Sequence, residues 1–302
     1  MTEMKNSVKI WIITAVVLIA AGAVMFTASI ASANFDFSVL DNSEYVTNVH
    51  YQKERVESFD IKVTTADVSF LPSDDGTCKV VCFENSKKAH KVSLVDGTLK
   101  IEPQDTRKWY EKIGVTIGKK TEVKIYLNEY SFDKVSAESD TGKINMPADF
   151  DFSAADLETD TGDISWNANV KGEISAKADT GDITFSGISA DGVTVRTSTG
   201  HVKLDGVKAE NGISVKTSTG RIESIFVECR ELKTECSTGK VFIKSSTASE
   251  LMDIRTTTGG VTFESADAGE IKVKTDTGSV KGSLRTMKYF NAKTDTGKIE
   301  LP

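Results

Sequence analysis

Apolar and polar positions recur along residues 131–302 with a period of 19 or 20 residues, each copy centred on a small-[D/S/T]-T-G-x-[I/V] motif. Seven and five residues before each glycine the chain is apolar, with one exception, and three residues before it the side chain is small. These odd offsets share one face of a strand. The nine repeat glycines are Gly142, Gly162, Gly181, Gly200, Gly220, Gly239, Gly259, Gly278 and Gly297.

After the glycine the apolar positions lie two and four residues on, as in Val202 and Leu204. This shift of phase breaks strict alternation and predicts a corner at the glycine, where a positive φ is tolerated. Because one strand–corner–strand unit cannot bury its own apolar face, the copies must stack. We therefore predict an all-β fold, a β-solenoid (β-helix-like) of about nine coils of 19–20 residues. The invariant threonine before each glycine is expected to point inward and form a ladder.

Residues 56–130 lack the glycine motif but alternate like strands, and are interpreted as a degenerate N-terminal cap of the same domain (56–302). Residues 61–70 look like a first coil with its corner at Ala66, and 121–127 like another strand. Asp75-Gly76 and Asp96-Gly97 are predicted to be hairpin turns.

Residues 10–33 form one apolar stretch, long enough to cross a bilayer as a helix. Lys5 and Lys9 precede it and acidic residues follow, which predicts a cytoplasmic tail (1–9), one transmembrane helix (10–33), a linker (34–55) and an extracytoplasmic domain. Ala31-Ser32-Ala33 resembles a signal-peptidase site, so a cleaved signal peptide is the alternative. The stretch exceeds the usual signal-peptide core, and a retained anchor in the cell membrane is therefore the preferred interpretation.

Composition restricts the partners. The formal net charge is −7, and residues 1–33 are slightly basic, so the remainder is more acidic still. An acidic domain is a poor ligand for nucleic acid. Cys78 and Cys82 share a strand face but are too far apart to bridge. All four cysteines, including Cys229 and Cys236, are interpreted as small buried apolar side chains, although pairing of the last two stays open.

No catalytic, cofactor-binding or metal-binding residue is assigned. The Asp that often precedes T-G becomes Ser or Thr in the central copies, which favours a turn over a calcium site. Asp160 with Asp163, or Asp179 with Asp182, could form carboxylate pairs, but turns explain them equally. The histidines (His50, His90, His201) are scattered, and no phosphate loop or dinucleotide motif occurs.

Two further features are candidates for binding. The segment 106–114 (TRKWYEKIG) is either a recognition loop or a capping turn that tucks Trp109 and Tyr110 against the first coil. Four residues before the glycines, an outward offset is basic in six of nine copies. One interpretation of this row of basic residues is a binding track for an anionic envelope polymer or an acidic partner. The other is a solvated strand face whose charges are screened. We call these residues the basic stripe: Lys177, Arg196, Lys216, Arg255, Lys274 and Lys293.

The N-terminal helix, the FDFS junction (35–38) and the T-D-T-G-D-I repeats resemble the bacterial putative-adhesin or "toastrack" β-strand-repeat family, which includes LiaG-like cell-envelope proteins. The resemblance covers essentially the whole chain. It implies a non-enzymatic extracytoplasmic module in envelope stress response, scaffolding or adhesion, and carries over no catalytic residue. The alternative is a β-helix enzyme that acts on cell-wall or extracellular polysaccharide in a groove along the solenoid. No cofactor is expected, and the partners are the membrane and envelope proteins or wall polymer.

Overall fold

The computed structural model describes residues 6–32, 44–109, 119–286 and 289–301. Two compact units can be distinguished, and each is described by itself. One contains the helix α1 (Asn6–Ser32). The other, formed by Tyr45–Thr106 and Lys120–Pro302, holds all of the strands in the described ranges.

Helix α1 covers nearly all of the stretch predicted to span a membrane. Its segment Trp11–Ala28 has a mean hydropathy of 2.3, and none of it is buried against protein. A soluble core helix would bury its apolar side chains, so the length and exposure of this one suit a membrane span or a signal sequence.

The strands divide into a cap and a series of regular coils. The cap strands are β1 (Tyr45–Gln52), β2 (Ser58–Val63), β3 (Asp67–Pro72), β4 (Cys78–Asn85), β5 (Lys88–Val95), β6 (Thr98–Asp105) and β7 (Glu122–Leu127). The regular coils use β8 (Ser131–Ser139), β9 (Ile144–Met146), β10 (Asp151–Thr161), β11 (Ile164–Trp166), β12 (Asn169–Val170), β13 (Glu173–Thr180), β14 (Ile183–Ser186), β15 (Ser189–Thr199), β16 (Val202–Asp205), β17 (Lys208–Thr219), β18 (Ile222–Ile225), β19 (Glu228–Thr238), β20 (Val241–Lys244), β21 (Thr247–Thr258), β22 (Val261–Thr277), β23 (Val280–Leu284), β24 (Phe290–Thr296) and β25 (Ile299–Glu300).

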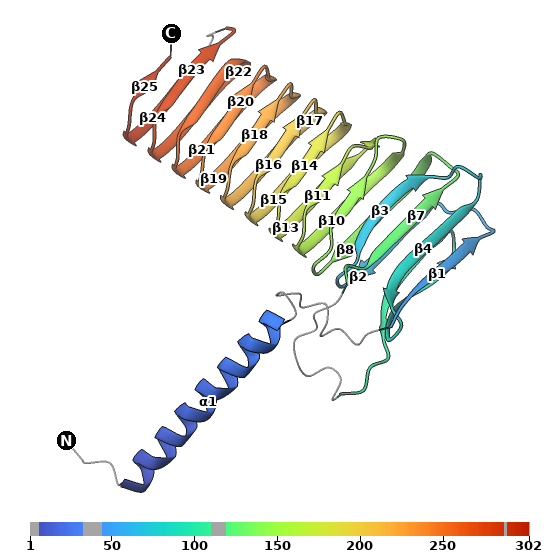
Figure 1. The fold of residues 1–302 in the computed structure, drawn as a ribbon. Coiled ribbons are helices and arrows are strands. Elements are labelled where there is room, and N and C mark those ends of the chain that lie inside the picture. Colours follow the sequence, from blue (N-terminus) through green and yellow to red (C-terminus); the bar gives the residue numbers. More distant parts are fainter. Residues whose placement is uncertain (1–5, 33–43, 110–118, 287–288, 302) are drawn as a thin grey trace. The chain divides into compact units, whose positions relative to one another are not determined.

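Each regular coil contains a long strand, a glycine corner and a short strand, and the coils stack in parallel as predicted (Figure 1). The long strands pair in the order β8–β10–β13–β15–β17–β19–β21–β22–β24. The short strands pair in the order β9–β11–β14–β16–β18–β20–β22–β23–β25. The predicted β-solenoid is confirmed.

The corner glycines are required because neighbouring coils approach each other closely there. A Cβ added to Gly200, where φ is +156°, would lie 1.9 Å from the carbonyl oxygen of Gly181 in the preceding coil. Gly162 has no such positive φ, yet its added Cβ would lie 2.1 Å from the oxygen of Gly142. Stacking, more than the positive φ that the sequence suggested, therefore explains why glycine recurs in every copy.

The buried small residue three positions before the glycine completes this contact. The hydroxyl of Thr197 donates to the oxygen of Gly181 at 3.1 Å, and Thr275 donates to that of Gly259 at 3.0 Å. Even Cys236 follows the pattern, with its Sγ 3.3 Å from the oxygen of Gly220. The inner face of the long strand thus ends, in five of the nine copies, in a side chain that hydrogen-bonds the corner of the preceding coil. Thr159 bonds the oxygen of its own corner glycine instead, and the hydroxyl of Thr256 has no partner among the described residues.

The predicted inward ladder of the invariant threonines is wrong. Thr199 and Thr219, which directly precede their glycines, are exposed, whereas Thr197 and Thr217 are buried. Alternation is lost two residues before the corner, where the chain already bends. The inward hydroxyls are therefore the ones at the third position before the glycine.

The apolar side chains of both strand types form one continuous core. Phe185, Leu204, Ile243 and Phe263 are all at most 2 % exposed, as predicted. Towards the cap the core becomes aromatic, because Phe59 packs edge-on against Phe70 and Phe132.

The cap continues both ladders and then changes direction. β2 and β3 form the predicted degenerate first coil, since β2 pairs with β8 and β3 with β9 in parallel. β6 and β7 add one more parallel layer. β4 then pairs antiparallel with β7 and β1, and β5 pairs antiparallel with β6.

Three details of the cap correct the sequence predictions. The linker predicted for 34–55 is wrong over Tyr45–Gln52, which forms β1, an edge strand on β4. Asp75-Gly76 does not close a hairpin, because β7 lies between β3 and β4. Asp96-Gly97 does close one, between β5 and β6, and both residues have positive φ (48° and 74°), as a two-residue turn requires.

Candidate functional site

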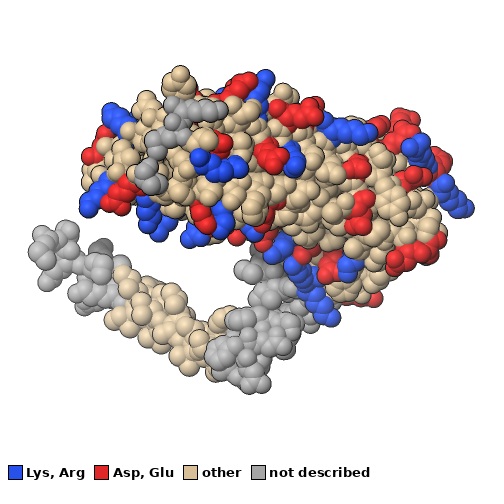
Figure 2. Space-filling model, turned by 90° about the horizontal axis from the view of Figure 1, so that it is seen from above, with Lys and Arg blue, Asp and Glu red and all other residues tan. Residues whose placement is uncertain are grey.

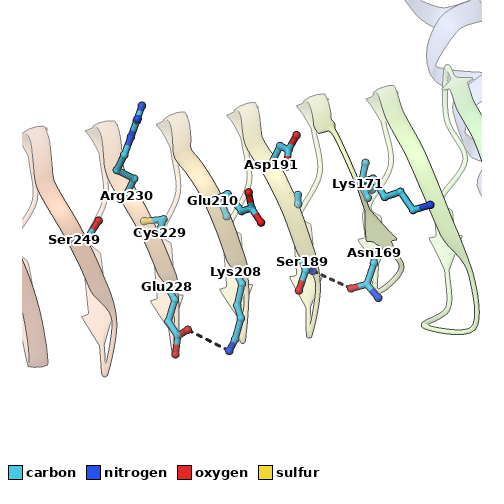
Figure 3. A pocket seen from close by; sticks show the side chains of 13 residues that line it. Asn169, Lys171, Ser189, Asp191, Lys208, Glu210, Glu228, Cys229, Arg230 and Ser249 are labelled. Atoms are coloured by element: carbon cyan, nitrogen blue, oxygen red, sulfur yellow. Dashed lines mark hydrogen bonds and ion pairs between the residues drawn. The ribbon is translucent and has the colours of Figure 1, made fainter.

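A shallow groove crosses five coils where the long strands begin, and Figure 3 shows it from close by. Its volume is about 740 Å³. Small side chains that are almost fully buried, Ala190, Ala209 and Cys229, lie along its floor. Polar residues form its rims: Asn169, Lys171, Ser189, Asp191, Lys208, Glu210, Glu228, Arg230 and Ser249. Such a trough can accept an extended chain that runs across the coils.

The groove lies where the length of the coil varies. The pairing of β15 with β17 shifts register here, because two residues separate Ala209 from Gly212 and only one separates Ala190 from Gly192. The same shift recurs between β17 and β19, and between β19 and β21. The difference between 19- and 20-residue coils is thus absorbed by bulges beside the groove, and bulges are frequent next to functional sites.

The basic stripe is aligned by the register of the long strands. Lys177 pairs with Arg196, Arg196 with Lys216, and Lys274 with Lys293. Glu235 interrupts the series between Lys216 and Arg255. All six cations are exposed. The repeat therefore does place these side chains in one column on the outer face of the long strands.

Acidic neighbours accompany most of the stripe. Lys177 pairs with Glu158 at 2.5 Å and Lys216 with Glu235 at 2.9 Å, both across adjacent coils. Arg255 pairs with Asp253 within its own strand, and Lys274 lies 3.9 Å from Asp276. For Arg196 and Lys293 the described residues provide no ion-pair partner. Figure 2 shows basic and acidic side chains interspersed over the face in view.

The flanks of Arg196 lack acidic side chains. On β15 the outward neighbours are Thr194 and Ser198, and on β17 Lys216 stands between Ser214 and Ser218. The Asp that precedes T-G in the outer copies is replaced by serine in these two. Within their own strands these two cations therefore have hydroxyl neighbours, and across the strands Lys216 pairs with Glu235.

The carboxylates considered for catalysis take part in the stacking of the coils. Asp163 accepts the backbone N–H of Asp182 at 3.0 Å, and Asp182 accepts that of His201 at 2.7 Å. His201 continues the column, because its Nδ1 accepts the N–H of Arg221. A hydrogen bond from Lys143, 2.7 Å away, lowers the pKa of Asp163, opposite to what a general acid needs.

The cysteines agree with the sequence interpretation. Cys78, Cys82, Cys229 and Cys236 are all buried free thiols. The side chain of Trp109 is exposed, and the capping-turn interpretation of its segment stays a prediction. Tyr110 lies outside the described residues, and recognition by the segment 106–114 stays a prediction.

One cluster was not anticipated from the sequence. Cys82 and Glu84 on β4 and His90 on β5 bring a sulfur, a carboxylate oxygen and a ring nitrogen within 4.8 Å of one another. All three side chains are buried. The spacing Cys-x-Glu puts two of them on one strand face, but the approach of His90 depends on the turn between β4 and β5, which no motif marks.

Stacked parallel coils, a continuous core and a non-repetitive cap define a β-solenoid repeat protein. A family model described as "Toastrack DUF4097" matches residues 56–213 and 208–302. The chain therefore belongs to the toastrack DUF4097 family, as its repeats indicated. Among curated proteins, none matches it.

Solved structures of several bacterial proteins are similar to this chain. A putative adhesin from Bacteroides fragilis has 15 % sequence identity and a TM-score of 0.46, with 86 % of this chain and 97 % of that one covered. A putative lipid binding protein from Parabacteroides distasonis has the same identity and TM-score, with 87 % and 98 % covered. A putative adhesin from Parabacteroides merdae has 13 % identity and a TM-score of 0.42, with 87 % and 98 % covered.

Proposed function

We propose that this protein is a non-enzymatic interaction module of the bacterial cell envelope, anchored in the membrane by α1 with its strands on the extracytoplasmic side. In this role it acts as a scaffold or adhesin, in envelope stress response or surface attachment. The single observation that carries the proposal is the register that aligns the basic stripe. Fixed, evenly spaced side chains on a stacked scaffold suit binding to a repetitive partner.

The partner that best fits the stripe is an anionic wall polymer such as teichoic acid. Adjacent strands are about 4.8 Å apart, so the stripe offers charges at short, regular intervals to a polymer of repeating phosphates. The ion pairs of Lys177 and Lys216 reduce the positive charge but leave both side chains more than half exposed. Arg196, flanked by hydroxyl groups, is the centre of the proposed contact.

The experiment is equilibrium binding of the full chain, in a neutral detergent, to purified teichoic acid at low and physiological salt. We expect binding that weakens with salt, because screening reduces contacts between exposed charges. Changing Arg196, Lys216 and Arg255 together to Glu should weaken it at least tenfold. The matched control changes Lys203, Arg221 and Lys240 to Glu, with the same change in net charge away from the stripe. Equal losses in both triple variants, or none in the first, would refute the stripe as a site.

Topology is tested separately. Lys5 and Lys9 precede α1 and the segment after it is acidic, which supports a cytoplasmic N-terminus. Protease added to intact protoplasts should digest residues 45–301 and leave Lys5 protected. Recovery of a mature chain that begins at Asn34 would contradict the retained anchor and favour a cleaved signal peptide.

The alternative function, an enzyme that cleaves polysaccharide, can be tested because the groove contains carboxylates. Asp191 and Glu210 project from adjacent long strands at its rim (Figure 3). Asp163 and Asp182, by contrast, are engaged by the backbone of neighbouring coils. If the protein cleaved polysaccharide, activity on cell-wall glycans would be measurable and would be lost in Asp191→Asn with Glu210→Gln. We expect no turnover by the unmodified chain.

A further inference from the structure

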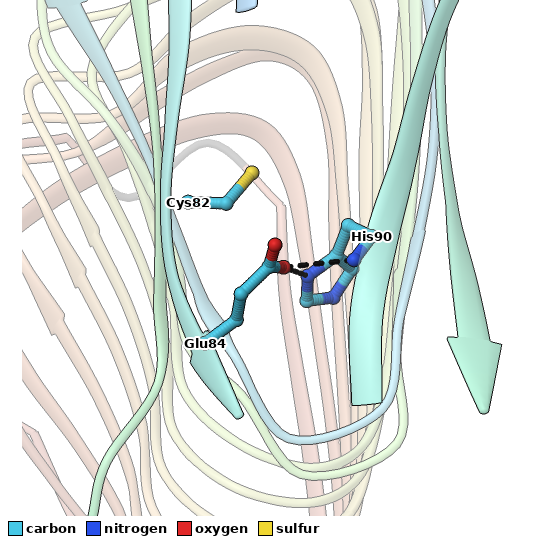
Figure 4. Close-up of side chains that lie close together, drawn as sticks. All are labelled: Cys82, Glu84 and His90. Carbon is cyan, nitrogen blue, oxygen red and sulfur yellow. Dashed lines mark hydrogen bonds and ion pairs between the residues drawn. The ribbon is translucent and has the colours of Figure 1, made fainter. Parts of the chain in front are cut away.

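The cap contains a buried group of three potential metal ligands, drawn in Figure 4. Cys82 and Glu84 are inward-facing residues of β4, two positions apart, and both are 0 % exposed. His90 is the inward-facing residue of β5 opposite them and is 8 % exposed. In the figure the carboxylate of Glu84 lies between the other two side chains. Two strands joined by a short turn thus supply sulfur, oxygen and nitrogen from one side of the cap.

Glu84 is held in place by three hydrogen bonds. Its Oε2 accepts from the backbone N–H of His90 at 2.8 Å and lies 2.6 Å from the ring Nδ1. Its Oε1 accepts from Nδ2 of Asn48, on β1, at 2.7 Å. Outer contacts of this kind orient the ligating carboxylates of metal sites. Asn48 therefore corresponds to the supporting residue that a metal centre needs.

Charge also fits a divalent cation. The Cys82 thiol must release its proton to bind a cation as a thiolate. A cation that displaces this proton would be neutralised by one thiolate and one carboxylate. A buried site is stable only when its charges are compensated in this way.

We propose that Cys82, Glu84 and His90 bind one zinc-type divalent cation, which would tie β4 to β5 within the cap. Mixed sulfur, nitrogen and oxygen ligands suit zinc, whereas calcium and magnesium prefer oxygen alone. Three protein ligands leave the fourth position of a tetrahedral ion for water. The Nδ1–Oε2 hydrogen bond would be replaced by two metal bonds. Typical zinc–ligand lengths then put those two atoms about 3.3 Å apart, a small adjustment.

The first test measures the metal in the full chain purified in detergent without chelator. We expect about one zinc ion per chain by elemental analysis. Replacement by Co²⁺ during refolding should give the visible ligand-field bands of a tetrahedral ion and a near-ultraviolet thiolate-to-cobalt band. If the purified protein contains no metal and also shows no thiolate band on refolding with Co²⁺, the metal site is refuted. Glu84 and His90 would then be only a buried hydrogen-bonded pair.

Variants distinguish ligation from general stability. Cys82→Ser should abolish the thiolate–cobalt band, and Asn48→Ala should weaken metal affinity about 10–100-fold while keeping the band. The matched control is Cys78→Ser, which alters another buried thiol on the same face of β4 and should leave metal content unchanged. Circular dichroism confirms that each variant is folded. Loss of the band in Cys78→Ser, or its persistence in Cys82→Ser, would contradict the assignment. The proposed metal site does not depend on the proposed binding of wall polymer, so either proposal can fail without affecting the other.

Discussion

The regular coils and the cap share the same strand–bend–strand unit but keep their register by different means. In the regular coils each glycine corner lies against the corner before it, and in five of the nine copies a hydroxyl or thiol bonds the carbonyl oxygen of the preceding corner. In the cap, this role falls to hairpin turns and to the hydrogen bonds that join the buried Glu84 and His90 to the half-buried Asn48. The register of each regular coil is thus set by residues that recur in every copy. The register of the cap depends on particular residues that occur only once.

The largest effect is expected at a corner glycine. Gly200→Val should cost about 5 kcal/mol or more and prevent stable folding, because its Cβ would meet a backbone oxygen that cannot move aside. Gly187→Val is the matched control, since φ is +66° there but no atom lies within 4 Å of the added Cβ. It should cost only the strain of a positive φ, about 1–2 kcal/mol. Denaturant unfolding followed by circular dichroism measures both, and similar midpoints would contradict a contact-based requirement.

Truncating a core side chain in one region should show whether the regular coils and the cap unfold separately. Leu204→Ala in the regular coils and Leu99→Ala in the cap both remove a fully buried side chain, at a cost of about 2–5 kcal/mol each. Because stacked repeats interact mainly with their neighbours, the damage should remain local. Cys229 should react faster with a thiol reagent in the first variant, and Cys78 in the second. Equal acceleration of both thiols in either variant would show that the two regions unfold as one.

A smaller effect tests the position of the inward hydroxyl. Thr197→Val removes a buried hydrogen bond to the corner of the preceding coil and should destabilise by about 1 kcal/mol. Thr199→Val, at the exposed invariant threonine, should change stability by less than about 0.5 kcal/mol. Thermal unfolding of the two variants measures both changes in stability. If Thr199→Val were the more destabilising of the two, the inward ladder expected from the sequence would be supported instead.

Acid should affect the cap through Glu84. Burial alone raises the pKa of this carboxyl, but the hydrogen bonds from His90 and Asn48 outweigh it and hold the pKa below its usual range. Stability from a lowered pKa is present above the unfolded-state value, near pH 4.5, and is lost as pH falls through the folded-state value. In metal-free protein, labelling of Cys82 by a pyridyl disulfide should therefore increase below pH 4.5. The increase should be weaker in Glu84→Gln, and an unchanged profile would exclude Glu84 as the cause.

The regular coils could be predicted because their information is local and repeated. The spacing of the glycines and the phase of the apolar residues specify strand, corner and inward face, and Phe185 and Leu204 are buried as expected. Thr199 was misplaced because alternation fails where the chain bends. The cap could not be derived in this way. β7 inserts between β3 and β4, and no local pattern encodes a pairing between segments that far apart. The cluster of Cys82, Glu84 and His90 depends instead on the turn between β4 and β5, which no sequence motif marks.

The bulges beside the groove also bear on how such a chain can change. Because β15 and β17 differ by one residue there while their glycine corners stay in register, the fold has a position at which length can vary freely. Whole coils are equally interchangeable at the corners, where successive copies present almost the same surface to each other. Unequal recombination between repeats would lengthen or shorten the stack by about 4.8 Å per copy without disturbing the core. The length of the stack can therefore change by whole coils, while the bulges beside the groove allow changes of single residues.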